Sequence, residues 1–147
     1  MAEPEMRQAD AEEAETARIL VVARGGWAGN WNPNDVLIAT HPEDGSIVAT
    51  ARETTAGPKN VRILASVWVK PELRGRRLGL RLTKLLMEKS SAEILWLDCR
   101  PELILYYSSI GFRLDDKAAL TPFYLDDSDP PDQVAMSFRK RPTAAAE

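Results

Sequence analysis

One succession of strand, helix and strand limits the fold of this chain more than any other feature. The segment VRILASVWV, residues 61–69, alternates apolar side chains on both of its faces, which is typical of a strand inside a sheet. After Pro71, leucines recur at helical spacing, and the run EILWLDC, residues 93–99, then predicts a short buried strand. Because parallel strands need a crossover connection, these patterns predict a right-handed βαβ unit at the centre of a sheet.

The remaining patterns add antiparallel strands and two further helices around this unit. Asp10 and Glu13 form a capping pair for a helix that we expect to end at Gly25. The other segments predict an edge strand, a hairpin, a helix and two final strands: MRQA, DVLIAT with SIVATARE, PELILYYSSIG, FRLDD and QVAMSFRK. The order β-α-β-β-β-α-β-α-β-β predicts an α/β fold with a mixed, mostly antiparallel sheet, a central parallel pair and flanking helices.

Length and composition are those of a single globular domain. The chain has 147 residues, of which 44% are hydrophobic and 28% are charged. A chain of this length buries a sizeable core. We therefore expect one domain over residues 1–147, with its core at about 6–139 and a flexible C-terminal tail at 140–147.

Charge and the scarcity of metal ligands exclude several classes of function. The net charge is −3 and the pI is about 5.3, so the chain as a whole is unsuited to nucleic acid or an acidic membrane surface. One histidine and one cysteine leave no zinc site of the usual type, and His41 in ATHPEDG is interpreted as a turn residue. The N-terminus has no signal-peptide core, and no apolar run is long enough to span a bilayer. We expect a cytoplasmic protein without a metal.

The helix start after Pro71 carries the strongest chemical signal. The segment LRGRRLG, residues 73–79, places arginines and two glycines where a helix N-terminus leaves backbone N–H groups unpaired. Glycine lets an anion approach the backbone, and arginine adds paired hydrogen bonds to phosphate oxygens, so the segment predicts a diphosphate cradle. A basic helix start that faces solvent is the alternative. The segment is neither a Walker A loop nor the dinucleotide-binding fingerprint, because the required residues and glycine spacing are absent.

Two motifs resemble the signatures of the GNAT family of acyl-CoA-dependent N-acetyltransferases. The first signature, Arg/Gln-x-x-Gly-x-Gly/Ala at a helix start, is matched by Arg74-Gly75-Arg76-Arg77-Leu78-Gly79. The second, Tyr-x-x-x-Gly-Phe on a later helix, is matched by Tyr107-Ser108-Ser109-Ile110-Gly111-Phe112. The two motifs have the order and about the spacing of the family, and the element order agrees from residue 6 to residue 139.

The resemblance implies acetyl-CoA as the cofactor and a primary amine as the acceptor. The cofactor diphosphate would bind the backbone amides of the first motif, closed by Arg74 and passing Gly75: Arg76, Arg77, Leu78 and Gly79. The pantetheine arm would pair with the strand backbone at Val67, Trp68 and Val69. Tyr107, favoured over Tyr106 by its spacing, would protonate the departing thiolate, and a phenol with an ordinary pKa of about 10 is suited to that role. The amine would attack the thioester carbonyl directly.

Departures from the family pattern concern the cofactor affinity and the general base. Arg77 replaces the first signature glycine, so the affinity for the cofactor is in question. The stretch ILASVW lacks the glutamate that many members carry on this strand. Glu53 or Asp98, acting through water, or no protein base at all, are the alternatives. Leu103 replaces an asparagine that is often found before the tyrosine.

The sequence gives several indications of the acceptor without selecting one. Residues 114–133, LDDKAALTPFYLDDSDPPDQ, form an acidic loop, and in this family that loop often borders the acceptor site. A carboxylate rim would attract a cationic amine, whereas the alternative is a solvated polar loop. Trp27 and Trp31 either shape the acceptor pocket or pack in the core. The run LDC before the tyrosine also resembles the glucosamine-6-phosphate acetyltransferase branch, whose Glu-Asp on the fourth strand is missing here.

Three functions from different classes remain open. The first is an active N-acetyltransferase. The second is a catalytically silent regulatory or interaction module, which should bind acetyl-CoA without turnover. The third is a nucleic-acid module that uses RGRRLGLR as a basic helix with salt-sensitive binding, and the acidic remainder of the chain argues against it. We expect the first, with no nucleic-acid or membrane partner, and with a homodimer as in many family members.

Overall fold

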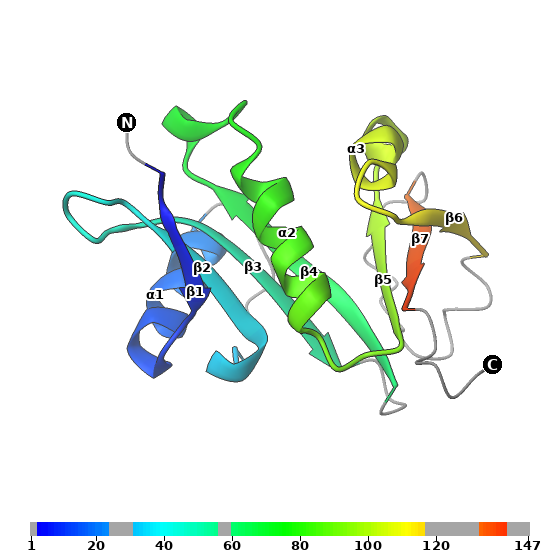
Figure 1. The fold of residues 1–147 in the computed structure, drawn as a ribbon, viewed down its shortest axis with the longest axis horizontal. Coiled ribbons are helices and arrows are strands. Elements are labelled where there is room, and N and C mark those ends of the chain that lie inside the picture. The colour runs from blue at the N-terminus through cyan, green and yellow to red at the C-terminus, as the bar shows by residue number, and fades with distance from the viewer. Residues whose placement is uncertain (1–2, 24–30, 56–59, 117–132, 141–147) are drawn as a thin grey trace. The chain divides into compact units, whose positions relative to one another are not determined.

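The computed structural model describes residues 3–23, 31–55, 60–116 and 133–140. Within these residues the strands form one seven-stranded mixed sheet in the order β1-β2-β3-β4-β5-β7-β6, accompanied by three α-helices (Figure 1). The predicted α/β class and element order are therefore confirmed. The chain divides into two compact units, of which the first comprises Met1–Glu53 with Ala65–Lys89, and the second comprises Thr54–Leu64 with Ser90–Glu147. Strand β4, Val61–Val69, contributes residues to both units.

The first unit begins with antiparallel strands and a helix. Strand β1, Glu5–Gln8, is the predicted edge strand and pairs with β2, Val36–Thr40, which in turn pairs with β3, Ile47–Thr55. A 3₁₀ turn, Pro33–Asp35, leads into β2. The β2–β3 pairing confirms the predicted hairpin, and His41 lies in its turn, where its Nδ1 accepts a hydrogen bond from the Glu43 amide at 3.1 Å.

Helix α1, Ala11–Val22, starts as its sequence predicts. The Asp10 carboxylate accepts from the Glu13 amide at 2.8 Å, and the Glu13 carboxylate accepts from the Asp10 amide at 3.0 Å, which is a capping box. Arg7 also pairs with Glu13, and these hydrogen bonds lower the Glu13 pKa to about 2. The described helix ends at Val22 with Ala23 as its cap, and the predicted stop at Gly25 lies outside the described residues.

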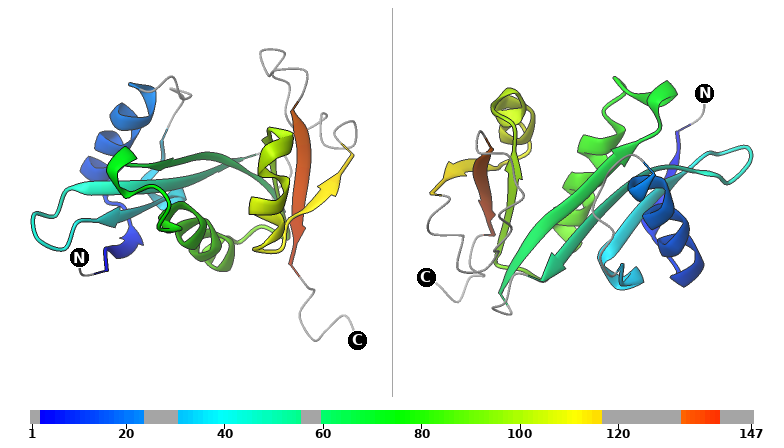
Figure 2. Two further views of the ribbon diagram at one scale, coloured as in Figure 1. Left: turned by 90° about the horizontal axis from the view of Figure 1, so that it is seen from above. Right: turned by 180° about the vertical axis from the view of Figure 1, so that it is seen from behind.

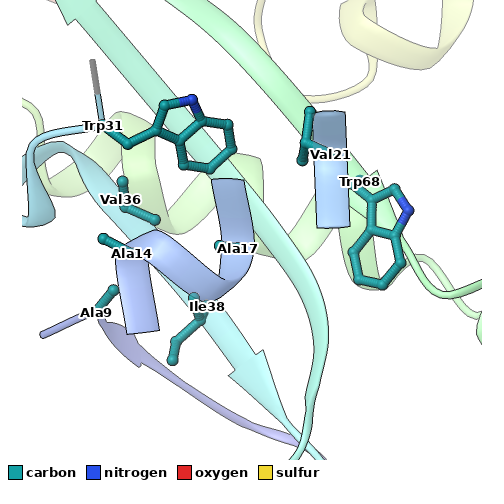
Figure 3. Close-up of a cluster of buried hydrophobic side chains, with 8 residues drawn as sticks. All are labelled: Ala9, Ala14, Ala17, Val21, Trp31, Val36, Ile38 and Trp68. Atoms are coloured by element: carbon teal, nitrogen blue, oxygen red, sulfur yellow. The ribbon is translucent and has the colours of Figure 1, made fainter. Parts of the chain in front are cut away.

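Helices α1 and α2 cover opposite faces of β2 and β3, as both views of Figure 2 show. Figure 3 shows the cluster on the α1 side, where buried side chains of α1 meet β2 and two tryptophans: Ala9, Ala14, Ala17, Val21, Trp31, Val36, Ile38 and Trp68. The core interpretation of Trp31 and Trp68 is therefore confirmed, while Trp27 lies outside the described residues.

Helix α2, Leu78–Lys89, begins later than the sequence suggested. Pro71–Leu73 forms a 3₁₀ turn, and the four residues from Arg74 to Arg77 form a loop rather than the first turn of the helix. The reason is local, because Gly75 and Arg77 have φ angles of 85° and 60°, which a right-handed helix excludes. The predicted apolar face is buried at Leu78, Leu82 and Leu86 and joined by Met87, whereas Leu85 is only half-buried.

The second unit contains the parallel pair and the last strands. Strand β5, Ile94–Cys99, runs parallel to β4 as the predicted βαβ unit requires, and it pairs antiparallel with β7, Val134–Arg139. Strand β6, Arg113–Asp115, pairs only with β7 at the edge of the sheet. Between β5 and β6 the chain forms a 3₁₀ turn, Pro101–Leu103, and a short helix α3, Ile104–Ser108, that is shorter than predicted.

Two small cores stabilise this second unit. Val61 and Ile63 of β4 pack with Trp96 of β5 and Ala135 of β7, which confirms Trp96 as a core residue. The Phe112 ring is buried between those of Tyr107 and Phe138, with centroid separations of 5.9 and 6.0 Å. No helix in the described part of the chain is long and apolar enough to cross a membrane.

Candidate functional site

The loop before α2 has the backbone geometry of an anion cradle. Its turn is closed by the Leu73 amide on the Lys70 carbonyl at 2.9 Å and the Arg74 amide on the Pro71 carbonyl at 3.3 Å. The next main-chain bond runs from the Arg81 amide to the Arg77 carbonyl at 3.0 Å. Among the described residues, the amides of residues 76–79 therefore have no main-chain acceptor, as expected at a helix N-terminus.

The arginines around this loop differ in what they contact. Arg74 donates through Nε to the carbonyl of Val69 at 3.2 Å, which ties the loop to the end of β4. Arg76 and Arg77 are exposed, and neither side chain has a hydrogen bond or ion pair to another residue in the described ranges. Two charged side chains are thus available beside the open amides.

Arg77 adopts the conformation that explains a glycine in the family signature. Its φ of 60° makes it the only non-glycine residue with a positive φ in the described part of the chain. Left-handed backbone costs a non-glycine residue about 1–2 kcal/mol, so a glycine would normally occupy this position. The substitution by arginine has preserved the turn of the loop, and the exposed side chain does not fill it.

The strand next to the loop presents its backbone rather than its bulkiest side chain. Trp68 is buried in the cluster of Figure 3, while Val67 and Val69 are half-buried. After Val69, the Lys70 amide bonds to the Val48 carbonyl at 2.8 Å, which fixes the end of β4 against β3. A role of Val67, Trp68 and Val69 in cofactor binding stays a prediction.

Tyr107 lies in α3 of the second unit, in an aromatic and partly dry environment. Its ring meets Tyr106 edge-on at 5.0 Å between centroids and Phe112 at 5.9 Å. Burial raises the pKa of the Tyr107 phenol well above its usual range, and Tyr106 and Cys99 add to that rise. The phenol is therefore a proton donor at neutral pH. Burial also raises the pKa of Tyr106, so the preference for Tyr107 stays a prediction.

The two candidate bases occupy different units. Glu53 is a buried residue of β3 in the first unit, and Asp98 is a half-buried residue of β5, opposite Ala135, in the second. Neither is selected by a described contact. No cluster of metal-binding side chains exists among the residues that the structure covers.

The cradle and the tyrosine likewise belong to different units. Residues 74–79 lie in the first unit and Tyr107 in the second, and the geometry of each unit is given on its own. Of the acidic loop, Asp115 and Asp116 are described, whereas Asp126, Asp127, Asp129 and Asp132 lie outside the described residues. Asp115 is already engaged, because it accepts hydrogen bonds from Ser137 and Arg139.

Sequence reasoning missed Arg52, a buried cation of the first unit. Only 1% of Arg52 is exposed, and its guanidinium lies 4.7 Å from the centre of the Trp31 ring. The alternation along β3 holds the signal for this position, because Arg52 pairs with Val36 and so faces the α1 side.

Comparison with known proteins settles the family. The model of the acetyltransferase (GNAT) family matches residues 5–112, which include both sequence motifs. The chain belongs to the GNAT family. No curated protein sequence matches this GNAT chain.

Solved structures agree with the fold of this GNAT domain. The Mycobacterium tuberculosis protein Rv2747, crystallised with CoA, has 15% identity and a TM-score of 0.75, covering 94% of this chain and 100% of its own. The ribosomal-protein-S18-alanine N-acetyltransferase of Escherichia coli has 17% identity and a TM-score of 0.66, with 96% and 97% covered. N-acetylglutamate synthase of Neisseria gonorrhoeae, crystallised with CoA and N-acetyl-glutamate, has 15% identity and a TM-score of 0.72 over 97% of this chain. The present chain spans only 36% of that synthase.

Proposed function

We propose that this protein is an N-acetyltransferase that moves the acetyl group of acetyl-CoA to a primary amine of a small molecule or peptide. The observation that carries the proposal is the loop before α2, with its open amides at residues 76–79 and its two left-handed residues, Gly75 and Arg77. Membership of the GNAT family and the CoA-bound solved structures support it.

The residues of the loop fit a diphosphate. The amides of Arg76, Arg77, Leu78 and Gly79 would donate to its oxygens, with the helix dipole adding positive potential. Exposed Arg76 and Arg77 would add charge, and Arg74 would hold the loop through its bond to the Val69 carbonyl. The backbone of Val67, Trp68 and Val69 would line the pantetheine arm. Acetyl-CoA, when bound, supplies an acetyl thioester that is activated toward amines.

The proposed proton donor is Tyr107. Its raised pKa keeps the proton on Oη at neutral pH, and a thiolate leaving group is basic enough to accept it. Glu53 or Asp98, each through a water, would remove a proton from an ammonium acceptor; if the amine binds already neutral, no protein base is needed. The remaining catalytic contribution is the positioning of the amine against the thioester carbonyl.

The acceptor class that we propose is a cationic amine, in a cytoplasmic protein that forms a homodimer. The acidic character of residues 114–133 supports a cation, although Asp115 contributes less than the sequence implied because Arg139 compensates its charge. A spermidine, lysine-peptide and neutral-amine panel separates cationic from uncharged acceptors. Light scattering measures the oligomeric state.

Calorimetric titration of acetyl-CoA tests the cofactor site without requiring the acceptor. Wild type should bind with micromolar affinity, and Arg74→Ala/Arg76→Ala should weaken binding at least about tenfold, because charge-assisted hydrogen bonds to phosphate are lost. The matched control is Lys84→Ala/Lys89→Ala, which removes two exposed charges of α2 outside the loop and should bind as wild type does. Absence of binding by folded wild type would reject the transferase.

A screen of amines then tests catalysis. Tyr107→Phe should keep acetyl-CoA affinity and lose turnover by about a hundredfold or more, which is the usual contribution of a general acid. Binding without turnover on any amine would instead indicate the silent CoA-binding module.

A further inference from the structure

A cavity of about 630 Å³ lies at the edge of the second unit, apart from the residues proposed to hold acetyl-CoA. It is lined by Gly111 and by residues of β6 and β7. Neither the loop at 74–79 nor Tyr107 lines it. Its volume is in the range of about 300–1,000 Å³ that small-molecule sites occupy.

Two arginines give the cavity a positive charge. Arg113 is exposed and makes no ion pair or side-chain hydrogen bond to any residue in the described ranges. Arg139 is 61% exposed and contacts the Asp115 carboxylate through one nitrogen at 3.3 Å, so its other donors remain available. Asp115 also accepts from the Ser137 hydroxyl at 2.5 Å, and these bonds lower its pKa. With Asp115 ionised, the three charges sum to one positive charge.

The rest of the lining is apolar. Leu114 is 60% exposed, and the half-buried Phe138 ring lies against the backbone at Gly111. A Cβ at Gly111 would come within 3.3 Å of that ring, so the glycine permits this close approach. Exposed leucine beside an aromatic ring suits a ligand with an apolar body.

We propose that the β6–β7 cavity binds a small organic monocarboxylate with an aromatic or aliphatic body, held by Arg113 and Arg139. The contact of Arg139 with the Asp115 carboxylate shows that this guanidinium already meets a carboxylate at the cavity wall. A singly charged ligand balances the one positive charge, whereas a phosphate dianion exceeds it and gains nothing from Leu114 and Phe138. The ligand would bind beside, and independently of, acetyl-CoA.

The probe is 3-phenylpropionate, titrated into the full-length protein and followed by calorimetry and by amide chemical shifts. Its neutral amide and inorganic phosphate are titrated in parallel. The carboxylate should saturate the site, while the amide and phosphate should bind at least about tenfold more weakly, because each lacks one half of the recognition. Shifts should concentrate in β6 and β7.

Arg113→Gln and Arg139→Gln should each weaken 3-phenylpropionate binding about tenfold. Arg100→Gln is the matched control, since it removes an exposed arginine of the same unit outside the cavity and should bind as wild type does. Arg113→Gln removes no described contact, so an unchanged melting temperature is expected for that variant.

Three results would overturn the proposal. The first is equal binding of the acid and its amide, and the second is no saturable binding of the acid by folded wild type. The third is binding that acetyl-CoA displaces and that Arg74→Ala/Arg76→Ala abolishes, because the probe would then occupy the cofactor loop. Each result leaves the acetyltransferase proposal intact.

Discussion

At the scale of the residue, Arg77 is the position where sequence and backbone conformation disagree. A φ of 60° costs a residue with a Cβ about 1–2 kcal/mol, but glycine loses about 0.4–1 kcal/mol through the greater freedom of the unfolded chain. Arg77→Gly should therefore raise the free energy of unfolding slightly, by up to about 1 kcal/mol, and keep acetyl-CoA binding. Arg77→Val should lower it by about 1–3 kcal/mol, because a β-branched side chain fits this conformation poorly.

Urea unfolding of the Arg77 variants measures both effects. Arg76→Val is the control, since Arg76 is also exposed but has a negative φ. If Arg76→Val and Arg77→Val have the same midpoint, the left-handed conformation of Arg77 is wrong.

Tyr107 makes a prediction about pH at the same scale. Its folded-state pKa is raised, while the unfolded phenol titrates at about 10, so the stability that the buried phenol contributes is complete below pH 10 and is lost as the pH rises above it. Unfolding measured between pH 9 and pH 11, a window of about one unit on each side of that value, should show a steeper loss for wild type than for Tyr107→Phe. Parallel curves would contradict a buried, protonated phenol.

At the scale of the element, the start of α1 combines a capping box with an ion pair. Asp10→Ala should lower the free energy of unfolding by about 1 kcal/mol, since the Glu13 amide loses its acceptor. Asp10→Asn retains an acceptor oxygen and should cost much less. Thermal melts at pH 7 of the two variants measure this difference, and equal losses would argue against the cap.

Glu13 gives that helix a dependence on acid. Its pKa falls from 4.5 to about 2 because Arg7 and the Asp10 amide bind its charged form. The resulting stability is present above pH 4.5 and is lost as the pH falls toward 2. Glu13→Gln should remove this part of the acid dependence, and melts at pH 5, 4 and 3, which span the ordinary glutamate pKa of about 4.3, measure it.

Elements with strong periodicity were predictable and irregular ones were not. Strand β4 has the predicted bounds, Val61–Val69, because its apolar residues alternate without interruption. The loop at 74–77 was not, since a positive φ at an arginine has no signature in residue type. Likewise, the motif at Tyr107 predicted where the tyrosine lies, but not the Arg113–Arg139 cavity, which depends on strand pairing between β6 and β7.

At the scale of the whole molecule, the prediction of one domain is testable because β4 belongs to both compact units. If the chain is one cooperative domain, global unfolding opens both units together. Native-state hydrogen exchange should then give the same free energy for the amides of Ile38 in β2 and Met136 in β7, both of which are fully buried residues. A difference of more than about 1 kcal/mol would indicate two units that open separately.

The position of β7 also determines when the chain can fold during its synthesis. The last described strand inserts between β5 and β6, so neither has its antiparallel neighbour until residues 134–139 have left the ribosome. The residues of the first unit have all emerged once Lys89 is free. Nascent chains that end shortly after β6 would thus carry two strand edges open to aggregation, and chaperones that bind such edges would meet this protein late in its translation.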